Sequence, residues 1–522
     1  MKRKMSNHPT KMKAENLISF VETPAEIADL MVKLITKQKD CDILDTGCGK
    51  GIFLNYLLEN GFTNIDGIEL NKMNYEFCKS NYSGVTLFNK DFLIWNPPKK
   101  YDLIIGNPPY AHFNSLPPEI QKEVADITKT RESDIYYAFI IKAIELLRES
   151  GELIYIVPYG FFYNTHAKIV RRKILENGLM QTIIDLDETR LFQDEHPETI
   201  IFKFLKRKQK NPEKMNILRV KNRNANPLEI FKKAIESLDK NKESTLFIFH
   251  QKSQFLGYDE IWSTFPQIEI PEYMNLKDIA YIGVGLVSGF DLAFRLDETE
   301  DENFTDEEMK SVTEFIKAAN CKGFWVEGSV KYILTEDQIK NESKISQIMP
   351  NIYKKIIIHK EEMSNRYLPN NKKWFHWQAL RNKTTFEKYM KFPKIFVPTL
   401  DRSKTNRFSL TSEAVYPSGD VLCIIPLKID PLFLLGYLNS NFFREYYLSY
   451  GARRGHRIAF TQRILANIKI PSFSSEIVKK IKEITQTILA TQDQTRRALI
   501  DEVIENAFEQ GLFEKTGLLR YV

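Results

Sequence analysis

The chain has 522 residues, 43% of them hydrophobic, with a formal net charge of +6 and five cysteines. This length predicts two or more domains with sizeable cores. No stretch is long and apolar enough for a membrane span, and the basic start lacks the apolar region of a secretory signal. An odd number of cysteines without a C-x-x-C pair argues against a disulfide framework or structural zinc, and the eight histidines show no metal-ligand spacing. We therefore expect a cytoplasmic protein with reduced thiols, no metal and no membrane partner.

The first predicted helix begins near Thr23. Thr23 as N-cap, Pro24 at the first helical position and Glu26 three residues after the cap form the pattern of a capping box. The exposed N–H groups at such a helix end suit a carboxylate ligand. An ordinary capped helix without a ligand is the alternative.

A glycine-rich turn follows the first predicted strand. Residues 42–54 read as a short buried strand, a turn with Gly47, Gly49 and Gly51, and the start of a helix. Such a turn lets a nucleotide-type cofactor approach the backbone closely, although similar turns also serve plain strand-to-helix connections. The second strand ends at Glu69, 24 residues after Asp45. A ribose-binding acid is expected roughly 20 residues beyond the turn, so Glu69 is the candidate ribose ligand.

The next two predicted strands also end in polar and aromatic residues: Asp91 and Phe92 follow residues 85–88, and Asn107-Pro108-Pro109-Tyr110 follow residues 101–106. Because neither proline has an N–H, the carbonyl of Pro108 can act as an acceptor beside the Asn107 side chain. Two acceptors directed at one exocyclic NH₂ group would orient its lone pair toward an electrophile. Tyr110 would then stack on the ring that carries the amino group.

Strand and helix alternation continues to about residue 204 and predicts a doubly wound, Rossmann-like α/β domain. We expect residues 206–244, which are hydrophilic, to close this half with surface helices and a connection. This gives a catalytic domain over residues 1–245 and a mixed α+β domain over residues 246–522. The acidic run 297–308 is most simply a surface loop.

Charge is unevenly distributed along the second half. Residues 251–320 carry 5 Lys and Arg against 15 Asp and Glu, whereas residues 351–470 carry 21 against 8. Aromatic residues such as Trp374, Trp377 and Phe408 are interleaved with the basic ones. A basic, aromatic-rich segment suits a nucleic-acid backbone, and a solvated lysine-rich surface is the alternative.

The order of Asp45 with its glycines, Glu69, Asp91-Phe92 and Asn107-Pro108-Pro109-Tyr110 resembles the S-adenosylmethionine-dependent DNA adenine-N6 methyltransferases. It looks most like the gamma-class, TaqI-type enzymes of type II restriction–modification systems. The second half resembles their target-recognition domain through looser motifs, namely residues 282–294, 438–440 and 468–471. The resemblance therefore covers most of the chain and implies S-adenosylmethionine as cofactor and double-stranded DNA as partner.

The resemblance assigns cofactor contacts to seven residues: Thr23 for the methionine carboxylate, Asp45 for the amino group, Gly47 and Gly49 for close backbone approach, Glu69 for the ribose, and Asp91 and Phe92 for the adenine ring. Asp45 and Glu69 could instead be structural acids at strand ends. Thr46 and Lys50 stand where many relatives carry proline and serine, which puts the fine geometry of the turn in doubt.

The implied reaction is methyl transfer to N6 of an adenine that has been flipped out of a short duplex recognition sequence. Asn107 and the Pro108 carbonyl would grip N6, Tyr110 would stack on one face of the base, and Phe192 on the other. Phe192 suits a core position equally well. No covalent intermediate is expected, since none of the cysteines follows a proline as in cytosine-C5 enzymes.

Basic residues of the second half are the candidate DNA contacts: Arg402, Lys404, Arg407, Arg453, Arg454, His456 and Arg457. A single active site suggests a monomer near the prokaryotic nucleoid that protects host DNA from a separate cognate endonuclease. The recognition sequence cannot be read from the chain. Two other functions stay open: a protein glutamine-N5 methyltransferase, because an amide NH₂ needs the same acceptors, and a catalytically silent DNA-binding relative.

Overall fold

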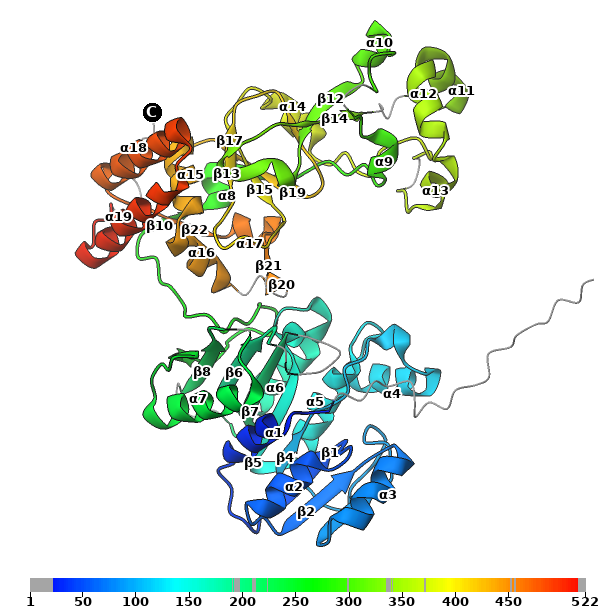
Figure 1. Cartoon of the computed structure of the whole chain (residues 1–522), viewed down its shortest axis with the longest axis vertical. Helices are drawn as coiled ribbons and strands as arrows, with labels where there is room; N and C mark the ends of the chain where they lie inside the picture. Colours follow the sequence, from blue (N-terminus) through cyan, green and yellow to red (C-terminus); the bar gives the residue numbers. More distant parts are fainter. Residues whose placement is uncertain are drawn as a thin grey trace, which may run out of the picture. The chain divides into compact units, whose positions relative to one another are not determined.

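The computed structural model describes residues 22–189, 191, 198–208, 213–222, 224–297, 300–334, 339, 341–369, 372–450 and 457–514, together with the backbone of residues 453 and 454. The chain divides into two compact units, Met1–Gln267 and Ile268–Val522 (Figure 1). Each unit has hydrophobic clusters of its own on both faces of a central sheet.

The first unit is built on a nine-stranded sheet in the order β3-β2-β1-β4-β5-β7-β6-β8-β9. Its strands are β1 (Asp42–Thr46), β2 (Asn64–Ile68), β3 (Val85–Phe88), β4 (Tyr101–Gly106), β5 (Leu147–Pro158), β6 (Leu179–Asp187), β7 (Thr199–Leu205), β8 (Lys214–Val220) and β9 (Phe247–Ser253). The first five run parallel, and β7 pairs antiparallel with both β5 and β6. The central strands read as nearly continuous apolar runs because helices cover both of their faces.

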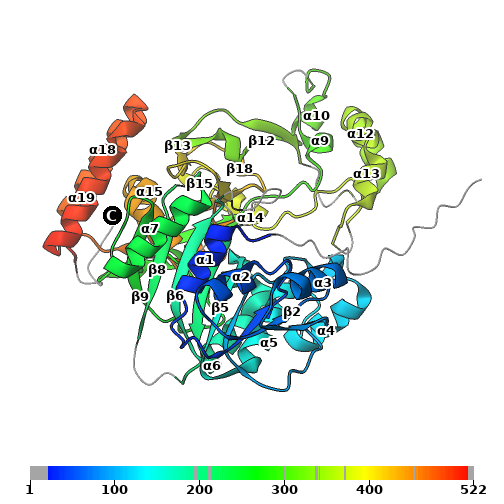
Figure 2. The same cartoon turned by 60° about the horizontal axis from the view of Figure 1, so that its bottom comes forward.

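Helices cover the sheet in two layers. One layer holds α1 (Ala25–Lys33), α2 (Ile52–Glu59), α3 (Lys72–Asn81) and α7 (Pro227–Lys240), which lie in a row in Figure 2. The other holds α4 (Pro118–Thr128), α5 (Ile135–Leu146) and α6 (Lys168–Asn177). This arrangement confirms the doubly wound, Rossmann-like fold that the sequence predicts.

The end of the first unit differs from the expectation of surface helices alone. Residues 214–220 form β8 and pair parallel with β6, and β9 pairs antiparallel with β8, so both strands extend the main sheet. The structure therefore divides the chain after Gln267, and the boundary expected after residue 245 precedes a strand that belongs to the first unit. These two strands, of which β9 forms the edge of the sheet, mix polar and apolar residues, so the hydrophilic stretch did not indicate strands.

The second unit is a mixed α+β structure, as expected. Its main sheet has the order β11-β19-β15-β17-β13, and three smaller sheets pair β10 with β22, β14 with β12 and β18, and β16 with β21 and β20. Their bounds are β10 (Tyr273–Asn275), β11 (Ala280–Val284), β12 (Val312–Ile316), β13 (Cys321–Val326), β14 (Val330–Ile333), β15 (Lys394–Pro398), β16 (Leu400–Asp401), β17 (Ser409–Thr411), β18 (Tyr416–Pro417), β19 (Val421–Pro426), β20 (Arg453–Arg454), β21 (Arg457–Ala459) and β22 (Lys469–Pro471).

Helices of the second unit also lie on both faces of its main sheet. Leu422 and Ile424 of β19 face one hydrophobic cluster, and Val421, Cys423 and Ile425 face the other. The first cluster includes α15 (Pro431–Asn439), α16 (Asn441–Leu448), α18 (Ser475–Thr491) and α19 (Arg497–Gln510), and the second includes α9 (Asp291–Phe294), α11 (Glu342–Ile348), α12 (Pro350–Ile357), α13 (Lys360–Asn365) and α14 (Lys383–Lys388). Three further helices are α8 (Leu276–Ile279), α10 (Asp306–Met309) and α17 (Gln462–Ala466).

Two expectations about the second half change with the structure. Within the acidic run, residues 306–309 form α10, and Glu308 is buried because it completes a capping box with Thr305 and accepts from the backbone N–H of Asn351. Most aromatic residues of the basic segment are core residues, since Trp377 and Phe408 are almost fully buried. They therefore pack the unit and do not form an exposed stacking surface.

No helix among the described residues is long and apolar enough to cross a membrane. All five cysteines are described, and none forms a disulfide.

A buried ion pair between β5 and β7 yields a stability prediction. Glu152 lies 3.2 Å from Lys203 Nζ with both side chains almost fully buried, and the same carboxylate accepts from the backbone N–H of Thr36. We expect Glu152→Ala to lower the free energy of unfolding by about 3–5 kcal/mol, because it leaves the Lys203 ammonium buried without its counter-ion. Urea unfolding curves measure this loss.

The matched control lies in the same unit. Glu145 pairs with Lys173 at 2.7 Å, but the Glu145 side chain is 54% exposed, so Glu145→Ala should cost about 1 kcal/mol or less. Equal losses for the two variants would contradict the assignment of Glu152 to the core.

Candidate functional site

Two loops meet at the carboxyl edge of the first sheet. β1 and β4 are parallel neighbours, so the glycine turn after β1 and the segment after β4 leave the sheet side by side. Strand order reverses between these two strands, which is where open α/β sheets bind ligands. The backbones approach closely there: a Cβ atom on Gly106 would lie 2.9 Å from Thr46 Oγ1. Glycine at this position therefore lets the two loops come together.

A pocket of about 170 Å³ opens between these loops and the segment ahead of α1. Nine residues line it: Glu22, Thr23, Gly47, Cys48, Lys50, Ile52, Phe53, Tyr82 and Asn107. The structure thus brings the predicted Thr23, Gly47 and Asn107 to one cavity. The other predicted residues that the structure describes in this unit do not line it: Asp45, Gly49, Glu69, Asp91, Phe92, Pro108 and Tyr110.

The glycine turn owes its shape to backbone that other residues rarely adopt. Gly47, Gly49 and Gly51 have φ of +73°, +55° and +84°. At Gly51 a side chain is disfavoured by the positive φ and also by a steric clash, because its Cβ would lie 2.2 Å from the ring of Tyr82. Tyr82 in turn donates from its hydroxyl to the carbonyl of Lys50 at 3.1 Å. The turn is therefore held in place by a residue beyond the end of α3.

Asp45 is the most unusual group of the site. It ends a central strand with no exposed surface, and neither carboxylate oxygen has a hydrogen-bond partner among the described residues. Burial raises the pKa of this carboxyl well above its usual range, and the nearby Cys78 and Glu69 add to the effect. A buried carboxyl without a partner is costly unless a cationic or hydrogen-bonding ligand completes it.

Glu69 lies one residue beyond β2 and is almost fully buried. Its Oε2 accepts from the backbone N–H of Gly49 and its Oε1 from that of Asn71, both at 2.7 Å. Burial raises the pKa of Glu69, while these hydrogen bonds oppose the increase. The carboxylate therefore ties the glycine turn to the end of β2, and each oxygen retains a second lone pair for a ligand.

Asp91 and Phe92 have local roles in the structure. Asp91 Oδ1 accepts from the backbone N–H of Leu93 at 2.8 Å. Phe92 is 3% exposed and packs on Phe139, with ring centroids 4.9 Å apart. Its ring therefore belongs to the core cluster of α5, and the predicted stacking on a cofactor would require ring surface that is covered in this structure.

The predicted capping box at the first helix is wrong. Pro24 is the N-cap of α1, and no side chain caps that helix end. The hydroxyl of Thr23 instead accepts from Asn107 Nδ2 at 3.0 Å, across the pocket mouth. A contact between residues far apart in the sequence thus replaces the local one, and it fixes the orientation of the Asn107 carboxamide.

Pro108 is buried and Tyr110 is partly buried. The Tyr110 hydroxyl donates to the carbonyl of Ile156 in β5 at 3.0 Å, and its ring meets Tyr136 edge to face at 6.2 Å. Tyr110 is thereby anchored to the sheet at one end. Phe192, the second predicted stacking residue, lies outside the described residues.

The predicted DNA contacts separate into groups. Arg402 and Lys404 are exposed, and Arg457 is partly exposed in β21. Arg407 donates to Asp401 Oδ1 at 3.0 Å and to the carbonyls of Ala318 and Cys321 at 3.2 Å, so its guanidinium braces the fold. The side chains of Arg453 and Arg454 and the whole of His456 lie outside the described residues.

Sequence reasoning did not assign six residues of the pocket: Glu22, Cys48, Lys50, Ile52, Phe53 and Tyr82. Ile52 and Phe53 directly follow the glycine turn, so their position at the start of α2 is a usable signal. Glu22 pairs with Lys50 at 2.6 Å across the pocket, and nothing in their spacing indicates this ion pair. Tyr82 likewise comes from a distant segment.

Within the part of the chain that the structure describes, no group of three or more His, Cys, Asp or Glu side chains is arranged to hold a metal ion.

Comparisons with known proteins agree with this geometry. A family model described as Eco57I restriction-modification methylase matches residues 24–192. The type II methyltransferase M.MjaIV of Methanocaldococcus jannaschii is 51% identical over 251 residues, which cover 48% of this chain and 84% of that protein. The type II methyltransferase M.HindII of Haemophilus influenzae is 30% identical over 469 residues, which cover 85% of this chain and 88% of that protein.

A solved structure of the type IIL restriction-modification enzyme MmeI in complex with DNA matches 94% of this chain and 73% of that chain. The TM-score is 0.60 at 12% sequence identity, so the likeness is one of fold. The similarity to M.HindII extends through both units, which does not favour the alternative of a protein glutamine-N5 methyltransferase.

Proposed function

Since the chain belongs to the type II DNA methyltransferases of restriction–modification systems, we propose that it methylates N6 of an adenine in a short duplex sequence, with S-adenosylmethionine as methyl donor. The observation that supports this proposal is that Asn107, the first residue of Asn107-Pro108-Pro109-Tyr110, lines the same pocket as the glycine turn. An amino-group acceptor and a cofactor loop are thereby adjacent.

The residues present fit the cofactor. S-adenosylmethionine carries an ammonium group, and the buried, unpartnered carboxylate of Asp45 is a suitable counter-charge. The backbone of Gly47 and Gly49 leaves room for close approach, and Glu69 accepts from the ribose hydroxyls with its remaining lone pairs. The cofactor supplies an electrophilic methyl group on sulfur, and the protein's residues place the amino group in line with it.

The target adenine must leave the duplex before N6 can reach this pocket. Unstacking and unpairing cost a few kcal/mol, and stacking on an aromatic side chain returns roughly 1–3 kcal/mol per base. Tyr110 is our candidate for one face of the base and Phe192 for the other. Anchoring of the Tyr110 hydroxyl to Ile156 limits the freedom of the ring before the base arrives.

Asn107 and Pro108 then orient N6. Because an Asn107 Nδ2 hydrogen is donated to Thr23, Oδ1 is the atom that accepts from the adenine amino group. The Pro108 carbonyl accepts the second N–H. Both acceptors would stabilise the positive charge that develops on N6 as its lone pair forms the new C–N bond and the thioether sulfur leaves with the electrons of the old C–S bond. One N6 proton must leave afterwards, and no covalent enzyme intermediate is needed.

The C-terminal unit is the proposed DNA-recognition domain, and double-stranded DNA is the proposed partner. Arg402 and Lys404 remain candidate phosphate contacts because both are exposed. One active site suits action as a monomer, and modification of host DNA suits a separate cognate endonuclease.

Substitution of Asn107 tests the catalytic assignment. We expect Asn107→Ala to reduce kcat for DNA methylation by about 10²–10³-fold, because one of two groups that stabilise charge on N6 is lost. Affinity for S-adenosylmethionine, measured by calorimetry, should change little. Methylation is measured as transfer of labelled methyl groups to DNA.

The control is Asn64→Ala, which removes an exposed asparagine at the first position of β2. Among the described residues, its side chain donates to the carbonyl of Asp40. This variant should keep full activity. If Asn107→Ala retained normal kcat, the assigned role would be wrong.

Cofactor binding should depend on pH through Asp45. Burial raises the pKa of Asp45, so in the free protein the carboxyl holds a proton below that raised value, and binding of an ammonium group must release it. Affinity for S-adenosylmethionine should therefore fall as the pH decreases below that raised pKa, by up to about tenfold per pH unit. Calorimetry in two buffers of different ionisation enthalpy measures the released proton.

Asp45→Asn should weaken binding and abolish the proton release, whereas Asp40→Asn, an exposed change just ahead of β1, should leave both unchanged. Persistence of the proton release in Asp45→Asn would assign it to another group.

A further inference from the structure

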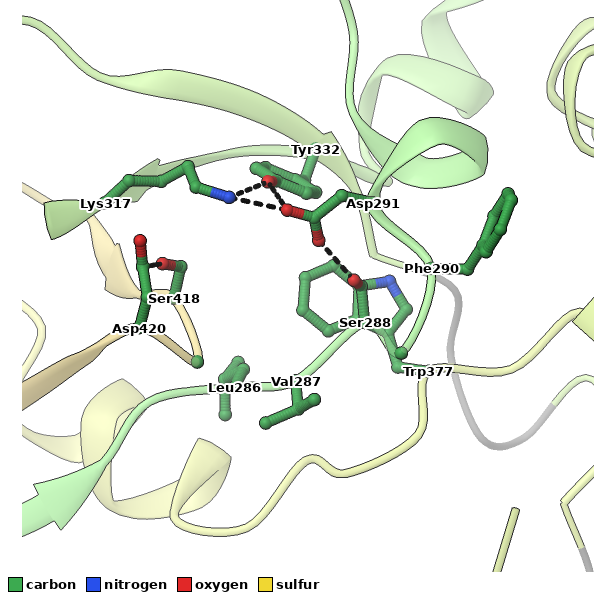
Figure 3. A pocket seen from close by; sticks show the side chains of 12 residues that line it. Leu286, Val287, Ser288, Phe290, Asp291, Lys317, Tyr332, Trp377, Ser418 and Asp420 are labelled. Carbon is green, nitrogen blue, oxygen red and sulfur yellow. Dashed lines mark hydrogen bonds and ion pairs between the residues drawn. The ribbon is translucent and has the colours of Figure 1, made fainter. Parts of the chain in front are cut away.

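The C-terminal unit has a larger pocket, with a volume of about 350 Å³, that none of the functions above uses. Its lining comes from the glycine-punctuated residues 286–291, from Lys317 just beyond β12 and Tyr332 of β14, from Trp377, and from the turn Ser418-Gly419-Asp420 ahead of β19 (Figure 3). The volume lies in the roughly 300–1,000 Å³ range of ligand pockets. Leu286 and Trp377 are buried beneath it, while Val287 and Phe290 are partly exposed, so polar and apolar groups share its surface.

A hydrogen-bond network holds one wall of the pocket. Asp291 Oδ1 accepts from the Ser288 hydroxyl at 2.5 Å. Asp291 Oδ2 accepts from Lys317 Nζ at 2.5 Å and from the Tyr332 hydroxyl at 2.9 Å. Lys317 Nζ also donates to the Tyr332 oxygen at 3.0 Å (Figure 3). Three of the roughly four acceptor positions of Asp291 are therefore in use, and the carboxylate holds Lys317 in place.

The opposite wall keeps spare hydrogen-bonding capacity. Asp420 accepts from the Ser418 hydroxyl, and from the backbone N–H of Ala318 at a long 3.3 Å. A carboxylate has about four acceptor positions, so Asp420 has room for another donor. Lys317 has three N–H donors, of which two are used by Asp291 and Tyr332. Lys317 therefore offers a spare donor from one wall and Asp420 a spare acceptor from the other, and the N–H of Ala318, which follows Lys317, links the two walls by donating to Asp420.

The charge of the pocket excludes a phosphate. Two carboxylates face one ammonium group, so the lining is net negative and repels the DNA backbone. A carboxylate on a DNA-binding unit instead suits an exocyclic amino group, as when Asp or Glu accepts from a base. Of the four bases, only adenine and cytosine present an amino group in the major groove, whereas guanine and thymine present acceptors that Asp420 would repel.

We propose that this pocket reads one amino-bearing base, adenine or cytosine, of the recognition sequence, with Asp420 accepting from the amino group and Lys317 donating to a neighbouring acceptor of the same base or its partner. This inference rests on the DNA methyltransferase function. It makes Asp420 a specificity-determining residue and Asp291 a positioning residue that acts through Lys317. The base read here is distinct from the methylated adenine, which is bound in the other unit.

Substitution of Asp420 tests the proposal. We expect Asp420→Ala to keep methylating DNA but to accept any base at one position of the motif where the wild-type protein demands adenine or cytosine. Sequencing that detects modified bases on DNA of mixed sequence reads this change directly. Asp278→Ala, which removes an exposed carboxylate outside the pocket, is the charge-matched control and should leave the motif unchanged.

A second measurement isolates the amino group. Oligonucleotides carrying purine in place of adenine, or 2-pyrimidinone in place of cytosine, lack only that group. At one motif position its removal should weaken binding to the wild-type protein by about 5- to 150-fold and leave binding to Asp420→Ala unchanged. The two substitutions also tell which of the two bases is read.

The proposal would be overturned if an active Asp420→Ala variant kept the wild-type motif. It would also be overturned if, for every amino group removed from the DNA, the wild-type protein and Asp420→Ala lost the same binding affinity. If Asp420→Ala does not fold, as judged by its thermal transition, Asp420→Asn replaces it, because asparagine keeps the shape and one acceptor. That variant should then favour adenine over cytosine at the position, since its amide also donates to the adenine N7. Loss of DNA methylation by the wild-type protein would instead refute the proposed function itself.

Discussion

The parallel pairing of β1 with β4 is the constraint on which the rest of the site depends. It places the glycine turn and the Asn107 segment at one edge of the sheet, and Gly106 lets the two backbones meet closely. Because both strands are buried in the centre of the sheet, the loops that leave them start from fixed points. The proposed cofactor pocket and the proposed amino-group acceptors are thus adjacent before any ligand binds, an arrangement that would reduce the entropy lost in bringing the reactants together.

The same burial leaves the site with an acidic side chain that the surrounding described residues do not pair. Asp45 lies at the end of a strand with no exposed surface, and Glu69, also buried, is compensated by two backbone N–H groups. The contrast between the two acids separates their roles: Glu69 shapes the turn as well as facing a ligand, whereas Asp45 has only a ligand to pair with. Such a buried, unpaired group lowers the stability of the folded protein, and it is retained where ligand binding offsets that loss.

Much of the first unit could be predicted from the sequence, because buried parallel strands are read from continuous apolar runs and each strand end carries a polar marker. The last two strands of the sheet, β8 and β9, were missed because they mix polar and apolar residues. Long-range contacts were not predictable either: Thr23 binds Asn107, and Tyr82 packs over Gly51, without any signal in their spacing. In the second unit, Arg407 and Trp377 match a DNA-binding composition, yet the structure uses them to brace and pack the fold.

Sequencing of plasmid DNA by a method that detects modified bases, after incubation with the purified protein and S-adenosylmethionine, tests the central claim most directly. The account predicts N6-methyladenine confined to one short motif, absent when the cofactor is withheld. Unmodified DNA from a protein that binds the cofactor normally by calorimetry would contradict it. The acceptor would then be an amino group outside DNA, or the chain would bind DNA without modifying it.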